Sequence, residues 1–320
     1  MNTFLTQQWG LSVPLINAPM TPAAGGALAA AVSAAGGLGM IGVSHLDSVK
    51  EIRDEVALFG LSRPEGKFGL GFHHWALTMR PDHLNAALET QPFLVSISFG
   101  DPAPFVRWFH EAGIQVATQI QDVDGALVAE DAGVDLIVAQ GTEAGGHTGE
   151  VGTLPLLQLV LDRVKTPVIA AGGIFSARGF AAALAAGAEG VWVGTPFLLA
   201  EEARVTNGAR RAIVDAKETE TILTSAFDRV QHLPWPEKFK GRTLRNEFTD
   251  RWHGREDEAC TDSDAEKLLQ KAKAEQNYDI AHVYAGQSVG GLTRLTTASE
   301  IVDSIAVRGE RWMRERVGKL

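Results

Sequence analysis

The stretch AEDAGVDLIVAQG, residues 129–141, decides the fold class because it joins a helix end, a cap and a buried strand. Its Ala-containing helical run ends at Gly133, the residue type that most often closes a helix in the left-handed conformation. The following run LIVA is apolar at every position, which is typical of a strand covered on both faces in a parallel sheet. The stretch therefore predicts one helix–strand unit of an α/β protein.

The same plan recurs along the chain in VSAAGGLGMIG (32–42), FHEAGIQVATQI (109–120) and LAAGAEGVWVG (184–194), with caps expected at Gly36 or Gly37, Gly113 and Gly187. Eight alternations of strand and helix favour a (β/α)₈ TIM barrel. A doubly wound open sheet is the alternative, because the hydrophobic pattern alone does not separate the two. The predicted strands are residues 15–20, 38–43, 67–72, 93–99, 115–120, 136–141, 167–173 and 191–197.

The composition changes after Phe197, where a charged and mostly helical pattern fills residues 198–276. We expect this segment to be an insertion after strand eight that forms a lid over the C-terminal face of the barrel. Residues 1–197 and 277–320 would then form the barrel, with a last amphipathic helix at about 298–317.

Charge and cysteine content exclude several classes of function. The chain has 29 Lys and Arg against 39 Asp and Glu, a net charge of −10, which argues against nucleic-acid binding and against an anionic membrane surface. Cys260 is the single cysteine, so neither an intrachain disulfide nor a cysteine metal cluster is expected. No apolar run reaches the roughly 18–20 residues of a membrane span, and the N-terminus lacks a signal-peptide pattern. We expect a cytoplasmic globular protein with small-molecule partners, and a homodimer is an option.

Two motif matches fail on context, and no metal motif is present. GLGMIG (37–42) fits a dinucleotide fingerprint, but a helix precedes it and a strand follows, the reverse of the required order. GQSVG (286–290) fits a hydrolase nucleophile turn, yet the last histidine is His282, upstream of the serine. His73 and His74 are adjacent and lack the spacing of metal ligands, so no metal site is predicted.

Three predicted strand ends carry the chemistry, because barrel active sites lie where the strands end. Gly172 and Gly173 follow strand seven, and Gly194 and Thr195 follow strand eight, the two loops that commonly bind phosphate. The third is AQGTEAGGHTGE (139–150), after strand six. Its Gly-rich backbone can approach a flat ligand, and its histidine would face the cavity.

These segments resemble the nitronate monooxygenases, which are FMN-dependent (β/α)₈ barrels. The resemblance rests on PLINAPM, AAVSAAGGLGMIG, AQGTEAGGHTG, PVIAAGGI, VWVGTPF and YAGQSVGGL, of which AQGTEAGGHTG is the most specific. It implies bound FMN and the oxidation of alkyl nitronates, with neutral nitroalkanes as a further option, by O2 to carbonyl compounds and nitrite. His147 matches the catalytic histidine of the family, a base toward nitroalkanes and an orienting group toward nitronates.

The resemblance also implies where FMN lies and where this chain departs from the family. Many members carry Asn at the end of strand three, where this chain has Gly71; His73, His74 or Gln119 could supply the missing hydrogen bond. The residues expected at the FMN site are Ala18, Pro19, Met20, Gln119, Gln140, Gly145, Gly146, Gly172, Gly173, Trp192, Val193, Gly194, Thr195 and Gln287.

The alternative is an NAD(P)H-dependent reductase, because FMN-type enoyl-ACP or enoyl-CoA reductases share the EAGGH loop and some family members reduce quinones. Such an enzyme needs cations for the phosphates of a second nucleotide. Arg242, Arg245, Arg251 and Arg255 could serve. Acidic residues interleave with them, which favours ordinary solvated helix charges, and nitronate oxidation stays the first expectation.

Overall fold

The computed structural model describes residues 1–63 and 65–317, and its centre is an eight-stranded parallel sheet in the order β1-β9-β8-β6-β5-β4-β3-β2. The sheet closes on itself, because Leu38 N donates to Leu15 O at 3.0 Å and Ile16 bridges Leu38. The TIM barrel is confirmed and the open sheet is wrong. Its strands are β1 (Leu15–Asn17), β2 (Gly39–Gly42), β3 (Phe68–His73), β4 (Leu94–Ser98), β5 (Gln115–Ile120), β6 (Leu136–Gln140), β8 (Val168–Ala171) and β9 (Val191–Val193).

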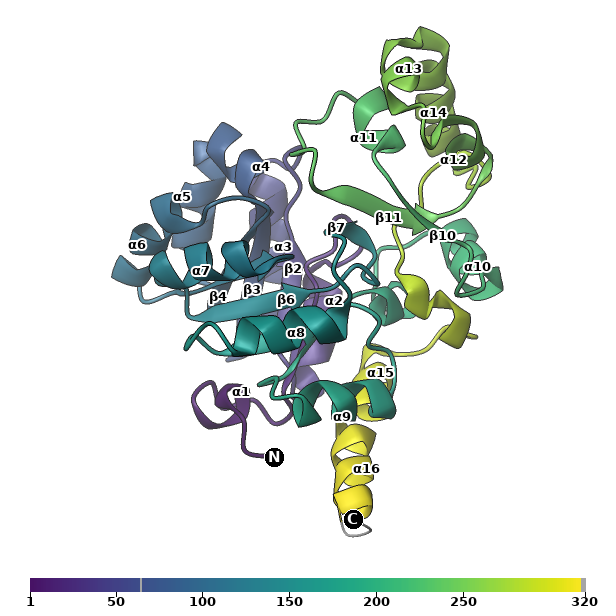
Figure 1. The fold of residues 1–320 in the computed structure, drawn as a ribbon. Coiled ribbons are helices and arrows are strands. Elements are labelled where there is room, and N and C mark those ends of the chain that lie inside the picture. Colours follow the sequence, from purple (N-terminus) through teal and green to yellow (C-terminus); the bar gives the residue numbers. More distant parts are fainter. Residues whose placement is uncertain (64, 318–320) are drawn as a thin grey trace.

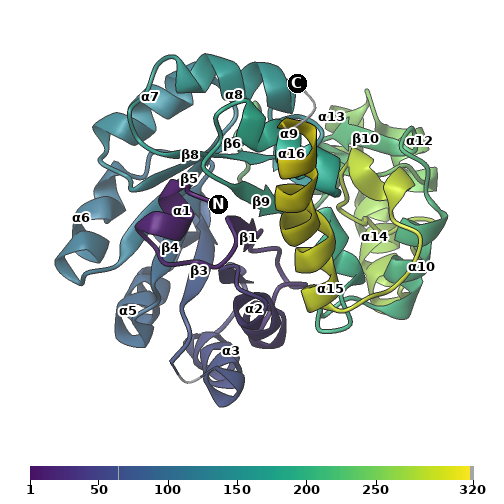
Figure 2. The same cartoon turned by 90° about the horizontal axis from the view of Figure 1, so that it is seen from below.

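Helices surround the barrel, and Figure 2 shows them around the strands when the molecule is viewed from below. The helix predicted at 298–317 is present, with a π-helical turn at Asp303–Val307 between its two α-helical parts. The wall consists of α2 (Gly26–Ala34), α3 (Val49–Ser62), α4 (His74–Met79), α5 (Pro81–Thr90), α6 (Ala103–Glu111), α7 (Val123–Asp131), α8 (Thr153–Leu161), α9 (Ala177–Ala185), α15 (Ala298–Val302) and α16 (Arg308–Val317), and α1 (Phe4–Gln7) precedes β1.

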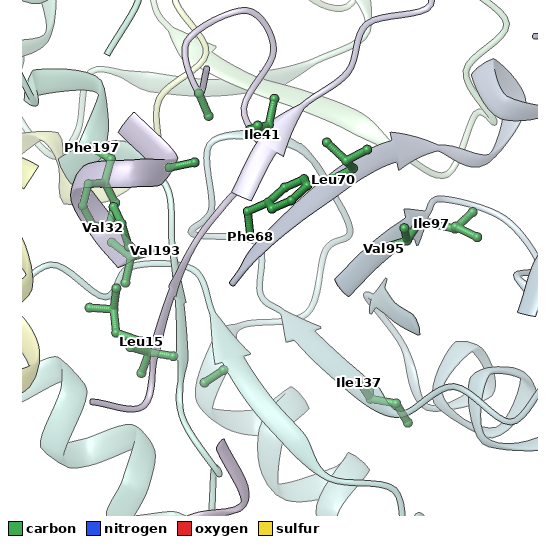
Figure 3. Packing of buried hydrophobic residues seen from close by; sticks show 14 of the residues in the cluster. Leu15, Val32, Ile41, Phe68, Leu70, Val95, Ile97, Ile137, Val193 and Phe197 are labelled. Carbon is green, nitrogen blue, oxygen red and sulfur yellow. The ribbon is translucent and has the colours of Figure 1, made fainter. Parts of the chain in front are cut away.

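Each strand buries both of its faces, which explains why the strands are continuously apolar. Leu15 and Val193 pack outward with Phe197 in the core beneath the helices, as Figure 3 shows. Ile16 and Trp192 alternate with them and belong to the core inside the barrel. The predicted caps also hold: Gly133 has φ +80° and Gly187 φ +104°, and at the first junction the left-handed residue is Gly36 (φ +95°).

The insertion contains helices, and it also contains two strands that the sequence did not reveal. Strands β10 (Thr221–Thr224) and β11 (Lys240–Leu244) form a small antiparallel sheet with β7 (Gly146–Thr148), which lies in the Gly-rich loop after β6. Figure 1 shows β7 between the barrel and the insertion helices. These helices are α10 (Asn207–Asp215), α11 (Ala226–Val230), α12 (Glu247–Trp252), α13 (Glu256–Thr261) and α14 (Ser263–Glu275).

This small sheet ties the insertion to the Gly-rich loop after β6 by backbone pairing. Gly241 of β11 pairs with His147 of β7, and Arg242 pairs with Gly146. A short strand in a glycine tract carries no alternation of polar and apolar residues, so sequence periodicity could not reveal it. Within residues 1–63 and 65–317, no helix combines the length and the apolar character of a membrane crossing.

Candidate active site

A cavity of about 730 Å³ lies at the C-terminal ends of the barrel strands and is also lined by residues of the insertion. Its volume is within the range of pockets that bind cofactors and small molecules. The structure brings most of the predicted site residues to its wall. These are Ala18, Pro19, Met20, Gln119, Gln140, Gly145, Gly146, His147, Gly172, Gly173, Trp192, Gly194 and Thr195.

Two predicted site residues do not line this cavity. Val193 points outward from β9 into the core beneath the helices, where Figure 3 shows it near Leu15 and Phe197. Gln287 begins a 3-10 turn and lines a neighbouring cavity of about 330 Å³, together with Gly172 and Gly173. The Val193 side chain points away from the large cavity, so it does not contact a ligand there.

The barrel wall suits a flat ligand with polar edges. Gly145 must lack a side chain, because a Cβ there would lie 2.5 Å from Gly286 N. Trp192 Nε1 is buried without a hydrogen-bond partner among the described residues, so it is a donor available to a ligand. Gln121 Nε2 donates to Gln140 Oε1 at 2.8 Å, which leaves the Gln140 amide nitrogen as a second donor. These features fit FMN.

Glu143 fixes the shape of the Gly-rich loop, and the sequence analysis did not single it out. Its carboxylate accepts hydrogen bonds from Thr153 N at 2.9 Å and from Thr153 Oγ1 at 2.8 Å. A carboxylate at the start of α8 is favourable because the first N–H groups of a helix lack partners within the helix. Glu143 thereby attaches the loop to a barrel helix.

His147 is held by a carboxylate of the insertion. Its Nε2 lies 2.9 Å from Oδ2 of Asp228, which is on α11, and both side chains are largely buried, with 9% and 4% exposed. An ionised carboxylate can only accept, so Nε2 must donate. The neutral imidazole then carries its free lone pair on Nδ1.

Two aromatic residues complete the surroundings of the imidazole. The indole of Trp235 stacks on the His147 ring, with centroids 3.4 Å apart and an interplanar angle of 7°. Tyr284 donates its hydroxyl to Asp228 Oδ1 at 3.4 Å. Burial, and then the nearby Asp228, raises the pKa of Tyr284 well above its usual value, so this hydroxyl keeps its proton.

The other buried histidines of the cavity wall are neutral. Burial lowers the pKa of His73 to about 3 and, in the same way, that of His282 to about 3. For His282, the charge of nearby Lys273 lowers the pKa further. Among the described residues, His147 alone of the histidines on this wall is hydrogen-bonded to a carboxylate.

Gly71 on β3 has no room for a side chain, because Pro19 packs directly against it. A Cβ on Gly71 would lie 2.2 Å from Pro19 Cγ, so a side chain there requires Pro19 to move. Of the three residues expected to compensate, His73 and Gln119 line the cavity. His74 does not; it begins α4 and packs edge-on against Phe105, with centroids 5.7 Å apart.

The four arginines considered for a second nucleotide are engaged elsewhere. Arg242 is buried and donates through Nε to Thr142 O at 2.6 Å, so it supports the Gly-rich loop. The other three are exposed and paired with acidic residues: Arg245 with Asp250, Arg251 with Asp262 and Arg255 with Glu258. In the described part of the chain, no group of three or more His, Cys, Asp or Glu is arranged to hold a metal ion.

Comparisons with known proteins agree with this geometry. A family model described as nitronate monooxygenase matches residues 76–307. Probable nitronate monooxygenases of Staphylococcus aureus (strain MSSA476) and Staphylococcus haemolyticus (strain JCSC1435) are each 29% identical, over 94% of this chain and 95% and 94% of their own lengths.

Two solved structures share the whole fold. FabK from Thermotoga maritima is 29% identical, with a TM-score of 0.87 and complete coverage of both chains. Nitroalkane oxidase from Streptomyces ansochromogenes is 25% identical, with a TM-score of 0.82 over 96% of this chain and 98% of that one.

Proposed function

The chain belongs to the nitronate monooxygenase family, and on that premise we propose that it is an FMN-dependent enzyme that oxidises alkyl nitronates with dioxygen. The products would be carbonyl compounds and nitrite. Two nitronate anions and one O2 give two carbonyl groups and two nitrite ions, so atoms, charge and electrons balance without NAD(P)H. When bound, FMN would supply the electron transfer from substrate to oxygen.

The observation that carries this proposal is the hydrogen bond between His147 and Asp228. Because Asp228 accepts from Nε2, the neutral ring has Nδ1 as its proton acceptor. A base in this position can remove the α-proton of a neutral nitroalkane and so form the nitronate. Asp228 stabilises the imidazolium that results, and the stacked Trp235 restricts the ring to one orientation.

The barrel residues would hold FMN through backbone and side-chain donors. Gly172, Gly173 and Gly194 provide bare backbone at the ends of β8 and β9, the positions that bind phosphate in many barrels. The hydroxyl of Thr195 accepts from Gly286 N at 2.9 Å, which leaves its own proton for a phosphate oxygen. Gln140 and Trp192 offer N–H donors to the edges of the ring system.

Anaerobic reduction of the bound flavin tests the proposal. The FMN-loaded protein is mixed with propyl-2-nitronate, NADH or NADPH in separate experiments, and the loss of flavin absorbance is followed. We expect rapid bleaching by the nitronate alone and none from free FMN under the same conditions. Bleaching by a nicotinamide nucleotide with none by the nitronate would overturn the proposal and favour the reductase alternative.

A further inference from the structure

Four aromatic side chains gather beside His147, and we call them the aromatic compartment: Trp75, Phe99, Trp235 and Tyr284. Trp235 lies at the centre of the group, with its ring centroid 5.1 Å from that of Phe99 and 5.8 Å from that of Trp75, both edge-on. Tyr284 lies on the side next to His147, with the centroids of their two rings 5.6 Å apart. All four line the large cavity, so their rings border space that a ligand can enter.

The backbone at Phe99 indicates that this arrangement is built rather than incidental. Phe99 has φ +69°, a left-handed conformation that residues with a large side chain rarely adopt. In this conformation its ring contacts Trp235 and Phe239 edge-on, the latter with centroids 5.3 Å apart. Strained backbone of this kind is concentrated at ligand sites, where the surrounding structure maintains it.

Within the described residues, no Lys or Arg side chain lies over any of the four rings of the aromatic compartment. Within the described chain, Arg204 and Lys273 are the Lys and Arg residues on the cavity wall. Arg204 pairs with Glu55, and Lys273 donates to Gln231 Oε1 at 2.7 Å. His73, which lies 4.8 Å from the Trp235 ring, is kept neutral by burial, with a pKa of about 3. The compartment itself therefore offers ring edges and faces, which favour an uncharged planar group.

Resting on the nitronate chemistry proposed above, we propose that the preferred substrates are alkyl nitronates and nitroalkanes that carry an aryl group, whose uncharged ring lies in the aromatic compartment. The reacting carbon would then lie at His147, next to the compartment. Edge-to-face and offset contacts with aromatic rings stabilise an aryl group more than a saturated group of similar volume.

Two substrates with the same reacting group test the preference. The nitronates of 1-nitro-2-phenylethane and 1-nitro-2-cyclohexylethane are compared by kcat/KM on the FMN-loaded enzyme, because the CH2 group keeps either ring out of conjugation with the reacting carbon. We expect the phenyl compound to be favoured by about 2- to 12-fold, the range that aromatic contacts provide. Equal or better use of the cyclohexyl compound would overturn the proposal.

Variants at Trp235 connect the preference to the aromatic compartment. In Trp235→Leu we expect the ratio of the two kcat/KM values to fall toward one, and in Trp235→Phe we expect most of it to remain. Trp108→Leu is the matched control, because Trp108 is 56% exposed on α6 and does not line the cavity. An unchanged ratio in Trp235→Leu would contradict the assignment.

Unreactive ligands separate this inference from the nitronate proposal. The dissociation constants of acetophenone and cyclohexyl methyl ketone are measured by calorimetry on the FMN-loaded protein. If nitronates fail to bleach the flavin while acetophenone binds more tightly, the nitronate proposal fails and the aryl preference holds. If nitronates bleach the flavin and the two ketones bind equally, the aryl preference fails and the nitronate proposal holds.

Discussion

The barrel and the insertion line the same cavity, but they do so with different parts of the chain. The barrel contributes strand ends and glycine-rich turns, such as Gly172 and Gly173, whose backbone is the useful surface. The insertion contributes individual side chains, Asp228 and Trp235, each in contact with His147. We infer that the barrel determines cofactor binding and stability, whereas the insertion determines how the histidine reacts.

His147 is where the two regions meet, so its removal should have the largest effect. We expect His147→Ala to lower the oxidation of neutral nitroethane by about 10²- to 10⁴-fold, the usual contribution of a general base. Oxidation of ethyl nitronate should fall much less, because that substrate has already lost its proton. Steady-state oxygen uptake measures the oxidation of both substrates, and flavin absorbance shows whether the variant retains FMN.

The control for this variant is His110→Ala, since His110 is 38% exposed on the outer face of the barrel. It should leave both activities unchanged. Full activity of His147→Ala on nitroethane, with flavin bound, would show that His147 is not the base.

Asp228→Asn tests whether an insertion residue controls chemistry without contributing stability. We expect a fall of about 10- to 100-fold in kcat/KM for nitroethane, the typical effect of losing a partner that orients a functional histidine. Asp250→Asn is the matched control, because Asp250 is a 60% exposed carboxylate of the insertion. A loss of flavin in Asp228→Asn, or no change in kcat/KM, would contradict the division between the two regions.

Gly71→Ala tests the barrel side, where a change should act on stability. The new methyl group would meet the Pro19 ring at 2.2 Å, so we expect a loss of about 1–3 kcal/mol in the free energy of unfolding, typical of overpacking. Urea unfolding measures it, and Pro19→Gly in the same chain, which also removes the Pro19 Cβ that would lie 2.3 Å away, should restore part of the loss.

Gly60→Ala is the comparison for that variant, because a Cβ at this position of α3 has no neighbour within 4 Å. It should be neutral or stabilising by up to about 1 kcal/mol, as alanine is the better helix former. A Gly71→Ala variant as stable as the wild type would mean that Pro19 moves freely.

A further prediction concerns acid stability at the junction after the insertion, where His282 lies. Burial lowers the pKa of His282 from 6.5 to about 3, so between these values the unfolded chain binds a proton that the folded chain does not. Stability must therefore fall as the pH drops below about 6.5, and His282→Gln should reduce that fall.

Thermal unfolding between pH 7.5 and 5 measures this effect. His253→Gln serves as the control, because that side chain is 46% exposed. If His282→Gln leaves the dependence of Tm on pH unchanged, the histidine is not held neutral.

The difference between the two regions also explains what the sequence could predict. Each barrel signal is local: the Gly133 cap and the strand β6 that follows lie within a few residues of one another, so pattern alone located strands and turns. The contact between His147 and Asp228 joins residues 81 positions apart. Nothing local distinguishes Asp228 from the other acidic residues of the insertion, and the β7 strand that brings the regions together is only three residues long.

The central claim is that His147 of the barrel and Asp228 of the insertion act as one unit, and a double-mutant cycle tests it most directly. We compare kcat/KM for nitroethane in His147→Ala, Asp228→Ala and the double variant, each with FMN bound. If Asp228 acts through His147, the double variant should be no slower than His147→Ala alone. If the two losses multiply, the residues act independently and the account is wrong.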